Sequence, residues 1–301
     1  MLDIAPSQQA ATWLGTFGRA LEAGDIEAAT HLFVDDCYWR DLLTFTWNIK
    51  TVDGQPAVRE MLKATLSSTQ PSHWRLSGES SVADGVIEAW FSFETAVARG
   101  EGILRLKDGR CRTLFTAMSE LKGFEEQKGP ARPLGIRHKA DPERETWAEA
   151  RAREARELGV HEQPYCLVIG GGQGGIMLGA RLRQLGVPTL IVEKNARAGD
   201  SWRNRYRSLV LHDPVWYDHL PYIPFPENWP VFTPKDKMGD WLEMYARVME
   251  LNYWVATKCI SAAYDEPEKL WTVVVDRAGE RITLKPKHIV FATGAYGPPR
   301  Q

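Results

Sequence analysis

The 301-residue sequence has few cysteines, no long apolar run and almost no net charge. Its four cysteines (Cys37, Cys111, Cys166 and Cys259) lie far apart and form no C-x-x-C pair. This spacing excludes a zinc ribbon and a redox dithiol, and it favours free thiols in a reducing compartment. No segment approaches the roughly 20 apolar residues of a membrane helix, and the N-terminus lacks the features of a signal peptide. We therefore expect a soluble, cytoplasmic protein without membrane contact.

Charge and composition exclude further classes. A formal net charge of −2 gives no basic excess for binding nucleic acid. A hydrophobic content of 44% with 25% charged residues is typical of a globular protein, and the length predicts two domains. No Ser–His–Asp set, paired acid and base, or metal-ligand cluster stands out, so we predict no metal and name no catalytic side chain.

The chain separates into three segments that differ in composition and in the spacing of apolar residues. Residues 8–122 predict two helices broken at Gly24 and Asp25, a strand, a third helix and then an antiparallel meander, which together make an α+β domain. Residues 123–163 begin with Pro and Gly and end in a run of Ala, Arg and Glu, which predicts a charged linker helix.

Residues 164–301 predict an α/β domain of the Rossmann type. A strand, a helix and a second strand are followed by a long aromatic and Pro-rich loop at residues 199–232. The next helix is predicted to have Thr233 as its N-cap and Pro234 as its first residue. Antiparallel strands and one buried strand, HIVFATG, end the segment.

A glycine-rich stretch, IGGGQGGI, follows the first of these strands. Gly170, Gly172 and Gly175 form the pattern G-x-G-x-x-G and lead into a predicted helix. The first glycine permits a tight turn, the second lets a pyrophosphate approach the backbone, and the third lets the helix pack close to the strand. Because the N-terminus of the helix then faces the phosphates, the stretch predicts a dinucleotide site.

The second strand, VPTLIVEK, ends on Glu193, where a carboxylate can accept hydrogen bonds from ribose hydroxyls. A 2′-phosphate would clash with Glu193, so the site favours FAD or NAD over NADP. The residues alone do not distinguish FAD from NAD.

Four further segments carry a resemblance to a known family: GDSWRNRY (199–206), LHDPVWYDHLPYIPFP (211–226), the helix after TPKDK, and VFATGAYGPPR (290–300). In this order they resemble the N-terminal half of the class B flavin-dependent monooxygenases, which include the plant-type indole-pyruvate monooxygenases. The resemblance covers residues 164–301. It implies that this Rossmann fold binds FAD, that NADPH binds in a second domain, and that a flavin hydroperoxide gives one oxygen atom to a small organic substrate.

The resemblance assigns cofactor-binding residues by their match to the family's motifs. The ADP half of FAD would be bound by Gly170, Gly172, Gly175 and Glu193, with Gln173, Gly174 and Lys194 beside them. The isoalloxazine would lie near Trp202, Arg203, Leu211, His212, Thr293 and Gly294.

Several of these assignments have structural alternatives. Trp202 is also explained as a packed aromatic, Arg203 as a helix cap or a partner of Asp200, and His212 as an ordinary turn residue. The aromatic residues of the loop are expected either to wall an aromatic substrate site or to pack on their own sheet: Trp216, Tyr217, Tyr222, Phe225, Trp229 and Phe232.

The family pattern continues with F-x-G-x-x-x-H and a second G-x-G-x-x-G, which this sequence does not contain. We therefore expect the NADPH site beyond Gln301, and we expect the chain to be a fragment or a truncated relative that is inactive alone. Two other functions remain open: a flavin- or NAD-dependent dehydrogenase, and a non-catalytic FAD-binding or dimerisation fragment. The expected partners are molecular oxygen and a small, apolar or aromatic substrate, such as a 2-oxo acid of the indole-pyruvate type.

Residues 8–122 resemble the NTF2-like (SnoaL-like) cone fold in their layout and in LFVDDCYWRDLLTF. Such folds often enclose a pocket, and the resemblance makes His31, Asp36, Arg40 and Asp41 candidate acid–base residues. The alternative is that Arg40 and Asp41 pair structurally and that the domain serves packing or forms a homodimer.

Overall fold

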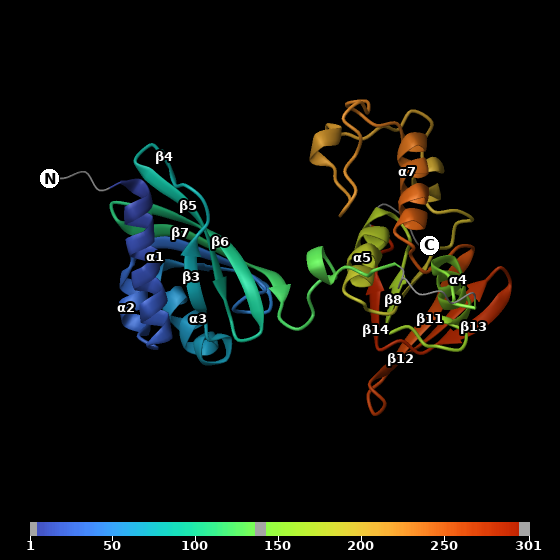
Figure 1. The fold of residues 1–301 in the computed structure, drawn as a ribbon, viewed down its shortest axis with the longest axis horizontal. Coiled ribbons are helices and arrows are strands. Elements are labelled where there is room, and N and C mark those ends of the chain that lie inside the picture. The colour runs from blue at the N-terminus through green and yellow to red at the C-terminus, as the bar shows by residue number, and fades with distance from the viewer. Residues whose placement is uncertain (1–4, 136–142, 295–301) are drawn as a thin grey trace, which may run out of the picture. The chain divides into compact units, whose positions relative to one another are not determined.

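The computed structural model describes residues 5–135 and 143–294. The chain divides into two compact units, residues 1–125 and 126–301, and each unit is described by itself (Figure 1). Within the described ranges, no helix combines the length and the apolar character needed to cross a bilayer.

The first unit is a mixed sheet covered on one face by helices (Figure 1). Its strands follow the order β2-β1-β7-β6-β5-β3, with β4 paired to β5, and only the β1–β7 pair is parallel among the pairs described. The elements are α1 (Pro6–Glu22), α2 (Ile26–His31), β1 (Phe33–Leu42), β2 (Ile49–Asp53), α3 (Gly54–Thr69), β3 (Ser72–Leu76), β4 (Ser81–Ala83), β5 (Val86–Glu94), β6 (Ala98–Lys107) and β7 (Arg110–Leu121).

Local sequence explains the breaks between these elements. Gly24 has a φ of 73°, and the Asp25 side chain accepts a hydrogen bond of 2.9 Å from the Ala28 amide, so one helix ends and the next begins there. Asp108 and Gly109 have φ values of 51° and 78°, which suit a two-residue hairpin between β6 and β7. The predicted helix break is confirmed, and this hairpin belongs to the predicted antiparallel meander.

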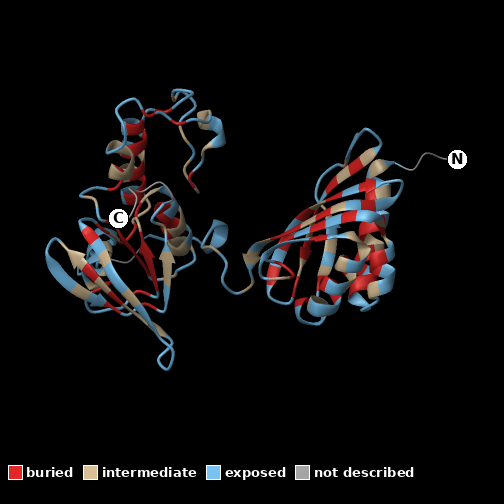
Figure 2. Ribbon diagram, turned by 180° about the vertical axis from the view of Figure 1, so that it is seen from behind, coloured by how far each residue is buried: buried red, intermediate tan, exposed pale blue. Residues whose placement is uncertain are grey.

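Aromatic rings fill the space between the helices and the sheet of the first unit. Buried residues of this unit are coloured red in Figure 2. Neighbouring rings have centroids 4.5 to 6.2 Å apart, which is the range of favourable ring contacts. Gly100 and Gly102 on β6 make room for two of them, because a Cβ there would lie 2.6 Å and 2.4 Å from the rings of Phe93 and Phe91. The rings are those of Trp13, Phe17, Phe33, Trp39, Phe45, Trp74, Phe91 and Phe93.

The second unit contains a parallel sheet of order β10-β9-β8-β14 and an antiparallel meander of order β11-β12-β13 (Figure 1). Its elements are η1 (Gly129–Ala131), α4 (Trp147–Glu157), β8 (Cys166–Ile169), α5 (Gln173–Gln184), β9 (Thr189–Val192), α6 (Asp200–Arg203), η2 (Val215–Tyr217), α7 (Lys235–Val248), β10 (Tyr253–Trp254), β11 (Thr257–Asp265), β12 (Leu270–Arg277), β13 (Glu280–Leu284) and β14 (His288–Phe291).

Both faces of the parallel sheet are covered. Every residue of β8 and β9 is buried, which is typical of parallel strands between two layers. Val168 and Ile191 belong to a core shared with α5 and α7, whereas Leu167 and Leu190 belong to a core shared with the meander. This arrangement agrees with the Rossmann-type fold expected from the sequence.

Helix α4 belongs to this second unit by its contacts. It begins with a capping box in which the Thr146 hydroxyl and the Glu149 carboxylate satisfy each other's backbone amides. Glu154 on α4 accepts hydrogen bonds of 3.0 Å from Arg183 and 2.7 Å from Asn252. These contacts fasten the charged helix that the sequence predicted to α5 and to the segment before β10.

Two details of the sequence-based description are wrong. Thr233 does not cap α7: the helix begins at Lys235, and the buried Thr233 hydroxyl has no hydrogen-bond partner among the described residues. Strand β14 is half exposed rather than buried, and the side chain of Phe291 is 65% accessible. The described sheet pairs β14 with β8 on one side only, so periodicity alone misjudged its burial.

Candidate functional site

The glycine loop between β8 and α5 is shaped by packing at its first and third glycines. Gly170 has a φ of 109°, and a Cβ on it would lie 2.4 Å from the carbonyl oxygen of Ala292. A Cβ on Gly175 would lie 2.0 Å from the carbonyl oxygen of Gly170. Both positions therefore require glycine for the fold itself, as the predicted turn and close helix packing demand.

Neither packing nor backbone conformation requires glycine at the second position of the pattern. Gly172 has a φ of −72° and a ψ of −172°, which any residue can adopt. A Cβ there would meet nothing closer than the Ser201 hydroxyl oxygen at 3.7 Å, an ordinary contact. The space in front of Gly172 is therefore open, as a backbone that approaches a ligand closely requires.

Gly172 is also the N-cap of α5. The amides of the cap and first turn have no carbonyl one turn earlier within the helix. These amides and the helix dipole together favour an anion, and Gln173, Gly174 and Gly175 form that first turn.

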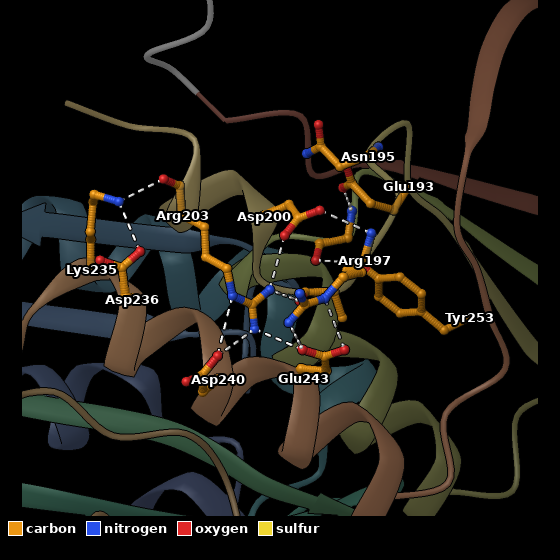
Figure 3. A network of polar contacts seen from close by, with 12 residues as sticks. Glu193, Asn195, Arg197, Asp200, Arg203, Lys235, Asp236, Asp240, Glu243 and Tyr253 are labelled. Atoms are coloured by element: carbon orange, nitrogen blue, oxygen red, sulfur yellow. Dashed lines mark hydrogen bonds and ion pairs between the residues drawn. The ribbon is translucent and has the colours of Figure 1, made fainter. Parts of the chain in front are cut away.

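Glu193 lies directly after β9 and faces the loop (Figure 3). Its side chain is buried, and its two carboxylate oxygens accept hydrogen bonds of 2.8 Å from the Gly171 amide and 2.9 Å from the Asn195 amide. Each oxygen keeps a further lone pair, so the carboxylate can also accept from two adjacent hydroxyl groups. The acid expected at the end of the second strand thus lies beside the glycine loop.

Ser201 is a site residue that the sequence reasoning missed. Its hydroxyl oxygen is buried, has no hydrogen-bond partner in the described chain, and lies next to Gly172. A buried hydroxyl without a partner is costly unless something outside the protein satisfies it. The segment GDSW contains this serine, but its sequence does not reveal that the hydroxyl is buried without a partner.

Trp202 and Gln173 connect α6 to the loop. The indole nitrogen of Trp202 donates a 2.9 Å hydrogen bond to the Gln173 side-chain oxygen, and the ring packs partly into the core of the parallel sheet. Trp202 therefore packs against its own domain, and its indole N–H is already used within the protein.

Arg203 lies at the centre of an ionic network (Figure 3). Its guanidinium donates to Asp200 at 2.9 Å, to Asp240 at 2.9 and 3.2 Å, and to Glu243 at 2.7 Å. A fifth bond of 2.9 Å goes to the Ala198 carbonyl oxygen, so all five N–H groups are used. The alternative that pairs Arg203 with Asp200 is confirmed, and the guanidinium has no donor left for a cofactor.

The remaining predicted residues divide between neighbours of the loop and outlying positions. Thr293 is close to the loop, because a Cβ on Gly170 would lie 3.0 Å from the Thr293 amide nitrogen, and exposed Gly294 follows it with a φ of 78°. Lys194 is exposed directly after Glu193. Two further residues lie on the connection before α7, and no hydrogen bond in the described chain joins them to the loop: buried Leu211 and exposed His212.

The aromatic loop is split between packing and exposure. Phe225 and Trp229 stack with centroids 4.8 Å apart, and both contact Trp241 on α7. Tyr222 hydrogen-bonds the Glu126 carboxylate. Large exposed areas remain on Trp216, Tyr217 and Phe232. Part of the loop therefore packs on α7 rather than on the sheet.

The candidate acid–base residues of the first unit do not form one site. His31 is exposed on α2 and hydrogen-bonds the Glu27 carbonyl oxygen, and Asp36 is exposed with Arg112 3.6 Å away. The concave side of the sheet is filled by the aromatic core described above. These positions bring no pair of titratable groups together around a cavity.

Asp41 has a different role from the one expected. Its buried carboxylate accepts hydrogen bonds from the amides of Phe45 and Thr46 at 3.0 and 2.9 Å, and from the hydroxyls of Thr46 and Thr116 at 2.8 and 2.9 Å. The expected pair of Arg40 with Asp41 is wrong, because neighbouring residues of a strand point to opposite faces and Arg40 is exposed. Asp41 instead holds the turn after β1.

No group of His, Cys, Asp or Glu in the described ranges has an arrangement that could hold a metal ion.

No family model matches the chain. The chain is 33% identical over 150 residues to indole-3-pyruvate monooxygenase YUCCA1 of Oryza sativa subsp. japonica, which covers 50% of this chain and 36% of that relative. It is 36% identical over 133 residues to an uncharacterized CzcO-like oxidoreductase of Geobacillus kaustophilus, covering 44% of this chain and 36% of the relative.

Over at most half of its length, this chain is similar in sequence to indole-3-pyruvate monooxygenases. It spans about a third of the length of these curated relatives. Among solved structures, a flavin-containing monooxygenase from Stenotrophomonas maltophilia is 25% identical with a TM-score of 0.40, covering 46% of this chain and 42% of that chain. OTEMO in complex with FAD and NADP is 26% identical with a TM-score of 0.41, covering 46% and 27%.

Proposed function

We propose that residues 126–301 bind FAD, as the N-terminal part of an FAD- and NADPH-dependent monooxygenase. The observation that carries the proposal is the open space in front of Gly172, a glycine that neither backbone angle nor packing requires. The other two glycines of the pattern are explained by the fold. A ligand that approaches the backbone at Gly172 explains the second one.

The residues present fit the ADP half of FAD. The first-turn amides of α5 and its helix dipole would hold the pyrophosphate, and the Ser201 hydroxyl, which lacks a partner, would donate to it. The carboxylate of Glu193 would accept from the ribose hydroxyls while it keeps its bonds to Gly171 and Asn195. Thr293 and Gly294, beside the loop, would line the flavin.

Bound FAD would supply the redox chemistry, which side chains cannot provide, by taking a hydride from NADPH and reacting with molecular oxygen. The chain's own residues orient the cofactor and exclude water from its buried side. The names of the relatives support monooxygenation of a small 2-oxo acid of the indole-pyruvate type. Exposed Trp216 and Tyr217 are suited to contact an aromatic substrate.

For the first unit we propose an NTF2-like cone without catalysis, which forms a homodimer. Its aromatic core fills the place of a pocket, and Asp41 is fully used in holding a turn. On the outer face of the sheet, Trp90, Ile103 and Phe115 occupy one cross-strand row, and Trp90 is half exposed. Such a row supports a dimer contact, and sedimentation of Trp90→Glu should show a monomer if this face is the interface.

The proposed function is tested by titrating the purified chain with FAD and following the flavin fluorescence. FMN is titrated in the same way, and the binding of NAD and NADP, which carry no flavin, is measured by isothermal titration calorimetry. We expect FAD to bind and FMN to bind far more weakly, because FMN lacks the adenosine and the second phosphate that the site recognises. Binding of NAD in preference to FAD would support the dehydrogenase alternative, and binding of none of the four would refute the proposal.

A further inference from the structure

A tyrosine on β10, two strands away from β8 in the sheet, reaches into the glycine loop. The Tyr253 hydroxyl, on β10, donates a hydrogen bond of 2.6 Å to the carbonyl oxygen of Gly171. The amide of the same Gly171 donates 2.8 Å to the Glu193 carboxylate. The loop is thus held on both sides of one residue, by two side chains from two different strands or strand ends.

The Tyr253 contact fixes a peptide plane rather than a single atom. The described chain has no cis peptide bonds, and in a trans peptide the C=O and the following N–H point in opposite directions. Because Tyr253 draws the Gly171 carbonyl toward itself, the Gly172 amide must point away from β10. No acceptor for that amide exists within the described chain, and the Gly172 side of the loop faces open space.

Steric fit and protonation both preserve this contact. A Cβ on Gly171 would lie 2.0 Å from the Tyr253 hydroxyl oxygen, so the tyrosine packs directly against a position where only glycine fits. Burial, with further contributions from Glu193 and Asp200, raises the pKa of Tyr253 well above its ordinary value. The hydroxyl therefore keeps its proton, and remains a donor, at neutral pH.

We propose that Tyr253 is a positioning residue of the nucleotide site, which turns the Gly172 amide toward the pyrophosphate. The inference rests on the proposed function, since it concerns the same site. In this proposal, binding of the pyrophosphate depends on the peptide that Tyr253 orients, whereas binding of the ribose depends on Glu193.

The test compares ADP and adenosine as ligands of wild-type protein and Tyr253→Phe, a change that keeps the ring and removes only the hydroxyl. We expect the Kd of ADP to rise about three- to tenfold, the value of one hydrogen bond. The Kd of adenosine, measured by NMR titration, should change less than twofold (roughly the scatter of such a comparison). Equal weakening of both ligands, or no weakening of ADP, would overturn the inference.

Tyr245→Phe is the matched control. Tyr245 is buried where Tyr253 is partly buried, and the Tyr245 hydroxyl donates a hydrogen bond of 2.5 Å to the Pro221 carbonyl oxygen, away from the loop. It should lower the melting temperature about as much as Tyr253→Phe and leave the Kd of ADP unchanged. A loss of ADP binding in Tyr245→Phe equal to that in Tyr253→Phe would show that general loosening, not positioning, is responsible.

A second measurement needs no variant. In the wild-type protein the Gly172 amide should exchange rapidly with solvent, and ADP should protect it and shift its NMR resonance, whereas adenosine should not. A Gly172 amide that ADP leaves unchanged would refute the inference even while FAD binding stands. If the wild-type protein binds neither FAD nor ADP, the proposed function itself fails and the role of Tyr253 fails with it.

Discussion

Replacement of Gly172 by alanine separates a ligand requirement from a folding requirement. The backbone angles at Gly172 suit alanine, and the new methyl group would touch only the Ser201 hydroxyl, at 3.7 Å. The main cost to the fold is a poorer helix N-cap, about 0.5–1 kcal/mol. For a unit of this size that lowers the melting temperature by about 1–4 °C.

The same methyl group would occupy the open space where the pyrophosphate is proposed to lie. Loss of one hydrogen bond to a charged phosphate is worth about 1.5–3 kcal/mol, which raises the Kd of FAD roughly 10- to 100-fold. FAD fluorescence titration measures this change, and circular dichroism melting checks that the variant is folded. Gly172→Ala that binds FAD with wild-type affinity would refute the reasoning from the open space.

Gly175→Ala is the opposite case within the same motif. Its Cβ would lie 2.0 Å from the carbonyl oxygen of Gly170, so α5 must move away from β8. Such overpacking costs about 1–3 kcal/mol or more. We therefore expect Gly175→Ala to be clearly less stable than Gly172→Ala. A Gly175→Ala variant with the wild-type melting temperature would show that the loop is far less tightly packed than the contacts indicate.

Three further predictions concern other parts of the chain. Ser201→Ala should raise the Kd of FAD about three- to tenfold by fluorescence titration without lowering the melting temperature, because its hydroxyl has no protein partner to lose; a normal Kd would exclude this hydroxyl from the site. Asp41→Asn should lower the free energy of unfolding of the first unit by about 2–4 kcal/mol, because an amide cannot accept all four hydrogen bonds that the carboxylate accepts. Urea titration measures this change, and an unchanged midpoint would contradict the role of Asp41 in holding the turn after β1. Burial raises the pKa of Glu154, but hydrogen bonds from Arg183 and Asn252 outweigh it and leave that pKa below its usual 4.5. The contribution of the Glu154 carboxylate to stability is therefore complete above pH 4.5 and is lost as the pH falls through the lowered pKa. The melting temperature of Glu154→Gln should depend less on pH in that acidic range than the melting temperature of the wild-type protein. An equally steep dependence in both proteins would show that Glu154 does not contribute to the acid sensitivity.

The sequence alone was sufficient to predict those parts of the candidate site whose residues lie close together in the chain. The turn at Gly170, the N-terminus of α5 and the position of Glu193 after β9 all follow from short segments whose backbone angles and periodicity are encoded locally. The same is true of the helix break at Gly24 and of the hairpin at Asp108.

Tertiary structure alone decided which polar groups are free. Arg203 is used completely by carboxylates up to 40 residues away, whereas the Ser201 hydroxyl beside it in the chain has no partner. Tyr253 reaches a carbonyl oxygen 82 residues earlier in the sequence. Sequence patterns indicate which groups can form hydrogen bonds. The packing of β10 against the glycine loop and of α7 against α6 determines which hydrogen bonds are made. The sequence by itself therefore determined where a nucleotide would bind, and the fold decided which side chains remain available to hold it, because a donor already paired within the protein is lost to a ligand.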